Sequence, residues 1–283
     1  MAKRTLSEWA IDIGYTDAEP SKIVTCCVYG ATGVGKTRFA GTFPNPFFID
    51  ADRGLRTLKD FHHPYYSLSK GQKVFSQIMV ILGDLSKKAP PFDKLDIKTI
   101  VIDSLTELAN FLLVESMKYP TSDKEISRQI EDEKPVWDDY AKLSGRMDTI
   151  VKKCRDLGLN FVATAGRKLD KDETTGEMLG LPNIVGGYRD IVGHQFDEYF
   201  YLEPKTKDGV TEYRAFTAKY KYFEAKSRDG RERIVTNPTY EKLYGKEEEK
   251  KKCNNIPHNT EKDSEKSGTK RVPTKTNPEK PRR

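Results

Sequence analysis

A glycine-rich run of eight residues near the start of the chain matches the pattern G-x-x-x-x-G-K-[ST] at every fixed position. The run consists of Gly30, Ala31, Thr32, Gly33, Val34, Gly35, Lys36 and Thr37. An apolar, β-branched stretch of strand length, residues 23–29, precedes it. Residues 37–40 can continue as a short helix, which Gly41 and Pro44 end. A strand, a glycine-rich turn and a helix in this order predict a phosphate-binding loop within an α/β fold.

The fixed positions of this loop have separate chemical roles. Backbone N–H groups of the turn surround the phosphates of a nucleotide, and the start of the helix adds the positive end of its dipole. Lys36 is expected to reach the β- and γ-phosphates, and the hydroxyl of Thr37 is expected to ligate Mg²⁺. We therefore assign all eight loop residues to nucleotide binding.

Apolar stretches of strand and helix length alternate along most of the chain. Strands are expected at residues 23–29, 46–52, 99–103, 159–165, 196–202 and 213–222, and helices at 71–87, 104–118 and 137–154. Residues 166–188 contain five glycines and are expected to form a long functional or mobile loop. The alternation predicts an α/β fold, in which a mainly parallel sheet has helices on both faces and a C-terminal antiparallel extension.

The composition suggests one large domain with two appendages. We assign residues 1–20 to an N-terminal segment, 21–244 to the α/β domain and 245–283 to a tail. The tail has a net charge of +5, from nine Lys and three Arg against seven acidic residues, and almost no large apolar side chains. It is predicted to be disordered. It either solvates the domain or tethers it to nucleic acid or a partner.

The sequence also predicts a cellular compartment. No apolar run approaches 18 residues, and the start lacks the apolar core of a signal peptide, so no membrane association is expected. Cys26, Cys27, Cys154 and Cys253 do not have the spacing of a metal site. Because neighbouring residues of a strand point to opposite faces, Cys26 and Cys27 are expected in separate parts of the core. A reduced, cytoplasmic protein is the resulting interpretation.

Carboxylates follow two of the predicted strands. Asp103 ends the apolar strand 99–103, and at the carboxyl edge of a parallel sheet it can hold the Mg²⁺ water shell. Capping of the next helix by Asp103 and Ser104 is the alternative. Asp50 and Asp52 are two residues apart, so both carboxylates can share one face of a strand. We assign Asp52 as the catalytic carboxylate that positions water; solvated or capping carboxylates are the alternative.

The segments Phe48–Asp52 and Ile100–Ser104, together with Gly54-Leu55, strongly resemble the ATPase core of RecA-type recombinases over residues 21–235. The resemblance implies that the chain binds ATP with Mg²⁺ and that Asp52 matches the catalytic acidic residue of the family. It also places Thr164 at the position that senses the γ-phosphate. Two residues depart from the family pattern. Asp52 is one methylene shorter than the usual glutamate, and Thr164 replaces an amide or imidazole.

The resemblance extends to the partners. Residues 166–188 occupy the place of the RecA loop that contacts single-stranded DNA, and compact phage-encoded RecA-core ATPases are the most similar group. The segment Ala225-Lys226-Ser227-Arg228 looks like the Lys-x-Arg element of RadA- and KaiC-type ATPases, which reaches the nucleotide of a neighbouring subunit. Lys226 and Arg228 are therefore predicted to act in trans, within a homo-oligomer. An ordinary basic turn before Asp229 is the alternative.

Three functions remain open from the sequence. The preferred one is an ATPase that supports single-stranded DNA recombination, annealing or replication in a phage-infected host cell, beside other recombination or replication proteins. The second is a P-loop kinase with residues 166–188 as a lid carrying Arg167 and Arg189. The third is a nucleotide-gated binding module with little hydrolysis, which the short side chain of Asp52 suggests.

Two aromatic segments are candidates for further nucleic-acid contacts. The run His62 to Tyr66 offers a stacking platform for bases, but a surface loop with partly buried tyrosines is the preferred interpretation. Residues 219–226 combine lysines with aromatic side chains and form the better basic and aromatic cluster, which can serve DNA or a subunit interface.

Overall fold

The computed structural model describes residues 23–59, 62–69, 73–118, 134–171, 173, 175–229 and 232–245. The predicted N-terminal segment 1–20, residues 246–283 of the predicted tail, and Cys253 therefore lie outside the described residues.

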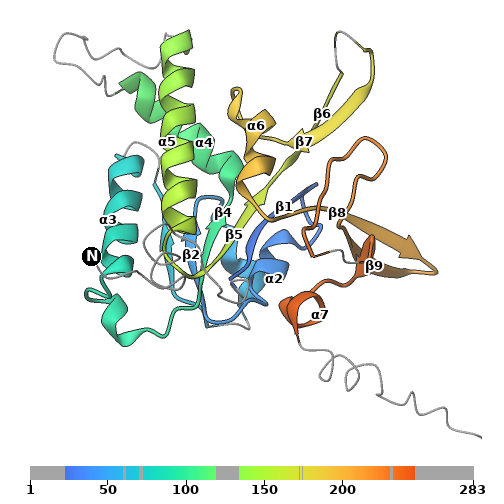
Figure 1. Cartoon of the computed structure of the whole chain (residues 1–283), viewed down its shortest axis with the longest axis horizontal. Coiled ribbons are helices and arrows are strands. Elements are labelled where there is room, and N and C mark those ends of the chain that lie inside the picture. The colour runs from blue at the N-terminus through green and yellow to red at the C-terminus, as the bar shows by residue number, and fades with distance from the viewer. Residues whose placement is uncertain are drawn as a thin grey trace, which may run out of the picture. The chain divides into compact units, whose positions relative to one another are not determined.

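The described residues are built around an eight-stranded sheet in the order β10-β9-β8-β1-β5-β4-β2-β3 (Figure 1). Its strands are β1 (Thr25–Gly30), β2 (Pro46–Asp50), β3 (Tyr65–Ser67), β4 (Thr99–Asp103), β5 (Asn160–Ala165), β8 (Glu198–Lys207), β9 (Val210–Phe216) and β10 (Ile234–Thr236). From β8 to β3 every pair of neighbours is parallel. The β8–β9 and β9–β10 pairs are antiparallel and form the C-terminal extension of the sheet.

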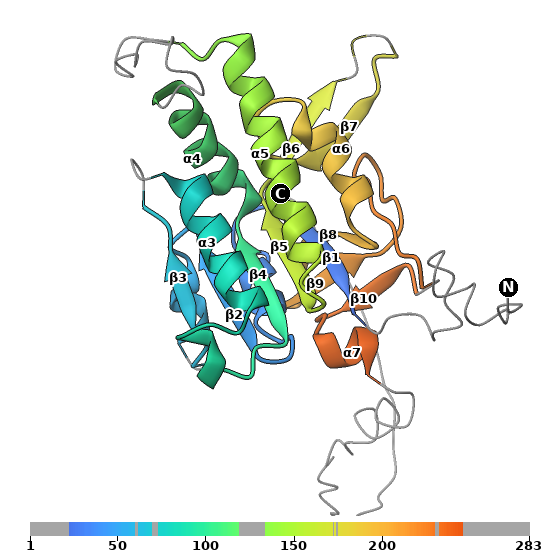
Figure 2. The ribbon, with the colours of Figure 1, turned by 60° about the vertical axis from the view of Figure 1, so that its left-hand side comes forward.

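Helices cover both faces of this sheet. They are α2 (Lys36–Ala40), α3 (Val74–Ser86), α4 (Leu105–Lys118), α5 (Trp137–Arg155), α6 (Tyr188–Ile191) and α7 (Tyr240–Tyr244), with the short 3₁₀ helices η1 (Leu55–Leu58), η2 (Phe92–Lys94) and η3 (Val192–Gln195). Figure 2 shows α3, α4 and α5 across one face, while α2 and α7 pack on the other. These features confirm the predicted α/β fold class.

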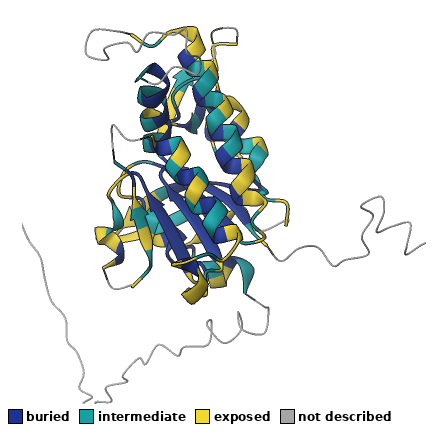
Figure 3. Ribbon diagram, turned by 90° about the vertical axis from the view of Figure 1, so that its left-hand side faces the viewer, coloured by how far each residue is buried: buried dark blue, intermediate teal, exposed yellow. Residues whose placement is uncertain are grey.

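Two apolar clusters follow from the strand periodicity. Successive side chains of a strand point to opposite faces, so Cys27 packs with the α3–α4–α5 side and Cys26 with the α2 side, as predicted. Strand β4, with the sequence TIVID, is buried along its whole length, as expected for a parallel strand covered on both faces. Figure 3 shows these buried strands beneath helices whose outer faces are exposed.

The prediction of a structureless loop over residues 166–188 was wrong. Residues Arg167–Lys171 form β6 and Met178–Pro182 form β7, which pair as an antiparallel hairpin. Strand β6, with the sequence RKLDK, is largely exposed and polar, whereas β7, with the sequence MLGLP, is apolar, partly buried and interrupted by Gly180 and Pro182. Neither strand shows the apolar and polar alternation that identifies a half-buried strand. The hairpin projects from the end of β5 (Figure 1).

The C-terminal strands also differ from expectation. The strand predicted at 196–202 extends to Lys207, and the one predicted at 213–222 ends at Phe216. Beyond Phe216 the chain turns back, and isolated bridges join Phe223 to Gly180 and Lys226 to Tyr199. The aromatic residues of this segment, which suggested a strand, are instead used for ring packing.

This ring packing attaches the hairpin to the sheet. The ring of Phe223 stacks on Tyr201 of β8, with 3.7 Å between ring centroids. The hydroxyl of Tyr29, on β1, donates a hydrogen bond of 3.1 Å to the carbonyl of Gly180 on β7. A Cβ added to Gly180 would lie 2.3 Å from Cδ1 of Phe223, so only glycine lets the ring approach this closely.

Changing Gly180 to alanine is therefore expected to destabilise the fold by about 1–3 kcal/mol, because the added methyl group overpacks the contact with Phe223. Chemical denaturation measures the effect. Gly145→Ala is the matched control. Nothing lies within 4 Å of a Cβ there, and this change within α5 should stabilise by about 1 kcal/mol. Equal stabilities for Gly180→Ala and the wild type would contradict the packing argument.

Candidate functional site

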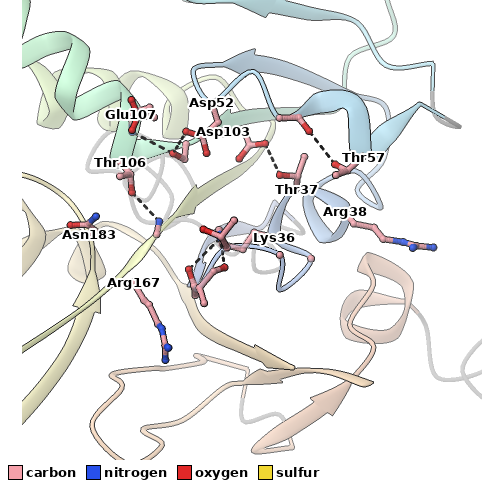
Figure 4. Close-up of a pocket in the computed structure, with 18 of the residues that line it drawn as sticks. Lys36, Thr37, Arg38, Asp52, Thr57, Asp103, Thr106, Glu107, Arg167 and Asn183 are labelled. Carbon is pink, nitrogen blue, oxygen red and sulfur yellow. Dashed lines mark hydrogen bonds between the residues drawn. The ribbon is translucent and has the colours of Figure 1, made fainter. Parts of the chain in front are cut away.

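A cavity of about 820 Å³ lies at the carboxyl ends of β1, β4 and β5, where parallel α/β sheets bind ligands (Figure 4). Its walls come from the glycine-rich loop, the segment after β2, the start of α4, the start of the β6–β7 hairpin, and β9. The lining residues are Gly30, Ala31, Thr32, Gly33, Gly35, Lys36, Thr37, Arg38, Asp52, Gly54, Thr57, Asp103, Ser104, Thr106, Glu107, Gly166, Arg167, Asn183 and Tyr213.

The glycine-rich loop has the backbone geometry that its sequence predicts. Gly33 and Gly35 have positive φ angles of 79° and 85°, which residues with a side chain rarely adopt. A Cβ on Gly30 would lie 2.5 Å from the carbonyl oxygen of Leu202 on β8. Val34 differs from the rest of the loop, because its side chain is 2% exposed and packs in the core. Only its backbone is therefore available for a phosphate.

Lys36 lies across the loop. Its Nζ donates to the carbonyl oxygens of Gly30, at 3.2 Å, and Ala31, at 2.8 Å. Burial lowers the pKa of Lys36, and the carboxylates of Asp103 and Asp52 act in the opposite direction. A bound phosphate would add negative charge beside the ammonium group and so favour its charged form.

Thr37 and Asp103 meet as the sequence predicts. The hydroxyl of Thr37 donates to Oδ2 of Asp103 at 2.8 Å. Adjacent ligands of an octahedral Mg²⁺ at ~2.1 Å are about 2.9 Å apart, and both atoms are the oxygen donors that Mg²⁺ prefers. The two side chains therefore fit a magnesium site. Burial raises the pKa of Asp103, while hydrogen bonds from Thr164 and Thr37 lower it.

Thr164 lies behind this pair. It is fully buried on β5, and its hydroxyl donates to Oδ1 of Asp103. Its side chain does not contribute to the cavity wall. Thr164 therefore contacts Asp103 and does not itself line the cavity, and its role as a sensor of the γ-phosphate stays a prediction.

Hydrogen bonds hold Asp52 next to Asp103 and Ser104. The carbonyl oxygen of Asp103 accepts hydrogen bonds from the backbone N–H groups of Ala51, at 2.7 Å, and Asp52, at 3.1 Å. The hydroxyl of Ser104 donates to Oδ1 of Asp52 at 3.0 Å. The carboxylate of Asp52 is thus fixed at the cavity wall, facing the side chains of Lys36 and Thr37 (Figure 4).

The expectation that Asp50 and Asp52 share one face was wrong. Strand β2 ends at Asp50, so the alternation of a strand does not continue to Asp52. Asp50 is 3% exposed, accepts a hydrogen bond of 3.2 Å from the Ser67 hydroxyl, and lines a different cavity. Of the two carboxylates, only Asp52 lines the cavity of the glycine-rich loop.

Lys226 and Arg228 lie away from the cavity of their own chain. The backbone of Lys226 pairs with Tyr199, which is opposite Cys27 on β1. Cys27 precedes Gly30 by three residues, or about 10 Å along a strand. Arg228 forms an ion pair of 2.8 Å with Asp197, and its side chain remains 66% exposed. Neither cation lines the cavity of its own chain, so their action on a neighbouring copy stays a prediction.

The cavity also contains residues that the sequence analysis did not assign to it. Arg38 follows the loop by one residue, a proximity that could have identified it. Asn183 and Tyr213 come from the β6–β7 hairpin and β9, and only the pairing of these strands brings them near the loop. Arg167, a candidate lid residue from the sequence, lines the cavity. The Thr106 hydroxyl fixes its position by accepting from the Gly166 N–H at 2.9 Å.

Comparison with known proteins gives a family and solved structures of similar fold. A family model described as an AAA domain matches residues 22–229. A KaiC-like protein from the hyperthermophilic archaeon Pyrococcus horikoshii OT3 is 15% identical, over 77% of this chain and 91% of that chain, with a TM-score of 0.42. No curated protein matches the chain significantly. Within the residues that the structure describes, no helix is both long and apolar enough to cross a membrane.

Proposed function

The chain belongs to the AAA-domain family, and from this premise we propose that it binds MgATP at the glycine-rich loop and hydrolyses it there. One observation carries the hydrolysis. The Asp52 carboxylate lies at the wall of the same cavity as Lys36 and the Thr37–Asp103 pair, and it is held there by the Ser104 hydroxyl. A carboxylate in this position can orient water, which distinguishes a hydrolase from a module that only binds nucleotide.

Each residue of this cavity has a separate role in the proposed hydrolysis. Loop amides and Lys36 hold the β- and γ-phosphates, and Thr37 and Asp103 would hold Mg²⁺, which neutralises phosphate charge. Asp52 accepts a hydrogen bond from a water molecule and aligns its oxygen with the γ-phosphorus. As the new P–O bond forms, the bond to the β–γ bridging oxygen breaks and ADP leaves with that electron pair. The proton of the water passes to Asp52.

A series of hydrogen bonds suggests how ATP hydrolysis at the glycine-rich loop changes the position of the β6–β7 hairpin. Thr164 contacts Asp103, and the next residues of the chain are Gly166, tied to Thr106, and Arg167 at the cavity wall. A shift of Asp103 on hydrolysis would therefore pass to the start of the β6–β7 hairpin. We propose that this hairpin contacts single-stranded DNA, with Lys171 on its exposed strand as a phosphate contact, because Lys168 is paired with Asp170 at 3.1 Å.

The remaining finer assignments rest on the resemblance to compact phage RecA-core ATPases. We propose a role in single-stranded DNA recombination, annealing or replication inside a phage-infected cell. Lys226 and Arg228 would complete the site of a neighbouring copy, which agrees with their distance from the cavity of their own chain. The kinase alternative needs both Arg167 and Arg189 in a lid over the nucleotide. Arg189 is paired with Asp170 and does not line the cavity, which argues against this alternative.

ATP hydrolysis measured with and without single-stranded DNA, over a range of protein concentrations, tests this function. We expect DNA to stimulate turnover and specific activity to rise with protein concentration, because each site would need a cation from another copy. Phosphate release without any acceptor separates hydrolysis from a kinase reaction. Turnover that is independent of both DNA and concentration would contradict the DNA role and the role of Lys226 and Arg228 in trans.

A further inference from the structure

A second cavity, of about 530 Å³, lies next to the nucleotide cavity and shares one wall with it. That wall is the segment 53–59, which contains η1. The residues that line this second cavity are Phe48, Asp50, Arg53, Leu55, Arg56, Leu58, Lys59, His62, His63, Tyr65 and Ser67. The ATP mechanism proposed above uses none of their side chains.

Because η1 is a 3₁₀ helix, residues of this wall that are three positions apart face the same cavity. Residues three apart stack on one face of such a helix, with a rise of about 6 Å per turn. Gly54 and Thr57 line the nucleotide cavity. Arg56 and Lys59 line the second cavity, and Arg53, whose φ angle of 55° turns the backbone just before η1, joins them there. The three cations form a row along the second cavity.

This row carries positive charge that no carboxylate pairs with within the described part of the chain. Among the described residues, the side chains of Arg53, Arg56 and Lys59 make no ion pair, although each is exposed and long enough to reach one. Among the residues that the structure describes, the carboxylate in the cavity wall is that of Asp50, which is 3% exposed. Its contacts are to the Ser67 hydroxyl and the backbone N–H groups of Arg53 and Gly54, so it anchors the turn rather than neutralising the cations.

An aromatic face completes the cavity. The Tyr65 side chain on β3 is 61% exposed at its rim, an unusual exposure for a large ring. His63 lies deeper, where its ring stacks on Phe48 and Nε2 contacts the carbonyl oxygen of Gly41 at 3.2 Å. His63 is therefore a structural support, and Tyr65 is the ring that remains available to a ligand.

We propose that the second cavity binds single-stranded nucleic acid, with successive phosphates on Arg53, Arg56 and Lys59 and a base stacked on Tyr65. A positive row beside an exposed aromatic ring is the arrangement by which proteins bind single strands without reading their sequence. The backbone rise of roughly 6 Å per 3₁₀ turn, which separates Arg56 from Lys59 along η1, is comparable with the separation of phosphates along an extended strand. This site is separate from the β6–β7 hairpin.

Because the two cavities share the wall that contains η1, binding in the second cavity should affect ATP hydrolysis in the first. A strand bound to Arg56 and Lys59 restrains η1, whose other face, Gly54 and Thr57, borders the nucleotide next to Asp52. Occupation of the second cavity is therefore expected to change ATP turnover. This consequence rests on the proposed ATPase function, whereas the binding itself does not.

The test is a salt titration of oligothymidylate binding to the full chain, followed by fluorescence anisotropy. Arg56→Glu/Lys59→Glu should reduce the slope of log K against log salt by about 0.7 for each phosphate that the variant no longer binds. Tyr65→Ala should weaken binding about tenfold with an unchanged slope, because stacking does not depend on counterions. Lys87→Glu/Lys94→Glu is the matched control. It makes the same charge change at exposed residues of α3's end and η2.

Each outcome either supports or overturns the site. Equal slopes for the cation-row and control variants would overturn the proposal, as would binding of thymidine monophosphate that is as strong as binding of the oligonucleotide. ATP binding by each variant shows that it is folded, and Arg56→Ala/Lys59→Ala repeats the test if charge reversal unfolds the chain. A protein that binds ATP without hydrolysing it, yet shows the altered slope, would refute the ATPase function while leaving this site intact.

Discussion

Replacing Lys36 with alanine is expected to lower the rate of ATP hydrolysis by at least about a hundredfold, because the variant lacks one cation that stabilises the transferring phosphate. The Nζ of Lys36 now lies against the carbonyl oxygens of Gly30 and Ala31, within the loop that would surround the phosphates. ATP affinity should also fall, because the same ammonium group contacts the ground-state nucleotide. A phosphate-release assay and a titration with a fluorescent ATP analogue measure the two effects.

Lys87→Ala is the control for this prediction, since Lys87 is an exposed lysine at the end of α3, outside the cavity. It should leave both hydrolysis and nucleotide affinity unchanged. Hydrolysis that survives in Lys36→Ala would show that the measured activity does not come from the glycine-rich loop. A contaminating ATPase or a second nucleotide site would then have to be sought.

The sequence was sufficient for the parts of the site that depend on short-range pattern. The loop from Gly30 to Thr37 needs two backbone turns with positive φ and a following helix, and these requirements leave a local signature. Asp103 could be placed because a continuous apolar run ends at it, and the carboxyl ends of parallel strands meet at one edge.

The parts that could not be predicted depend on long-range pairing. Tyr213 reaches the cavity because β9 folds back beside β8, and nothing near Tyr213 in the sequence indicates that contact. The β6–β7 hairpin was missed because β6 is exposed and polar, while β7 is a short apolar stretch that contains Gly180 and Pro182, so neither strand shows a clear alternation. The separation of Asp50 from Asp52 was missed for another reason. The strand ends between them, and strand ends are the least reliable feature of a sequence pattern.

This separation of the two carboxylates leads to the second large effect. Asp52→Asn is expected to lower turnover by about 10²–10⁴-fold, because the amide cannot accept the proton of the attacking water. ATP binding should persist, since Lys36, Thr37 and the loop amides are unchanged. Asp50→Asn is the comparison, and it should lower turnover far less than Asp52→Asn, because Asp50 lines the other cavity and can affect the nucleotide only through the turn that it anchors. Thermal unfolding of each variant separates loss of chemistry from loss of fold.

The length of the Asp52 side chain can be tested at the same position. Asp52→Glu restores the glutamate usual in RecA-type ATPases and moves the carboxylate one methylene further into the cavity, toward the γ-phosphate. Turnover should rise if the aspartate holds water too far from phosphorus, even though the longer chain changes the hydrogen bond from Ser104. Unchanged turnover in Asp52→Asn, together with a fall in Asp50→Asn, would reverse the assignment. The catalytic carboxylate would then be the buried one, reached only after η1 and the segment around it have moved.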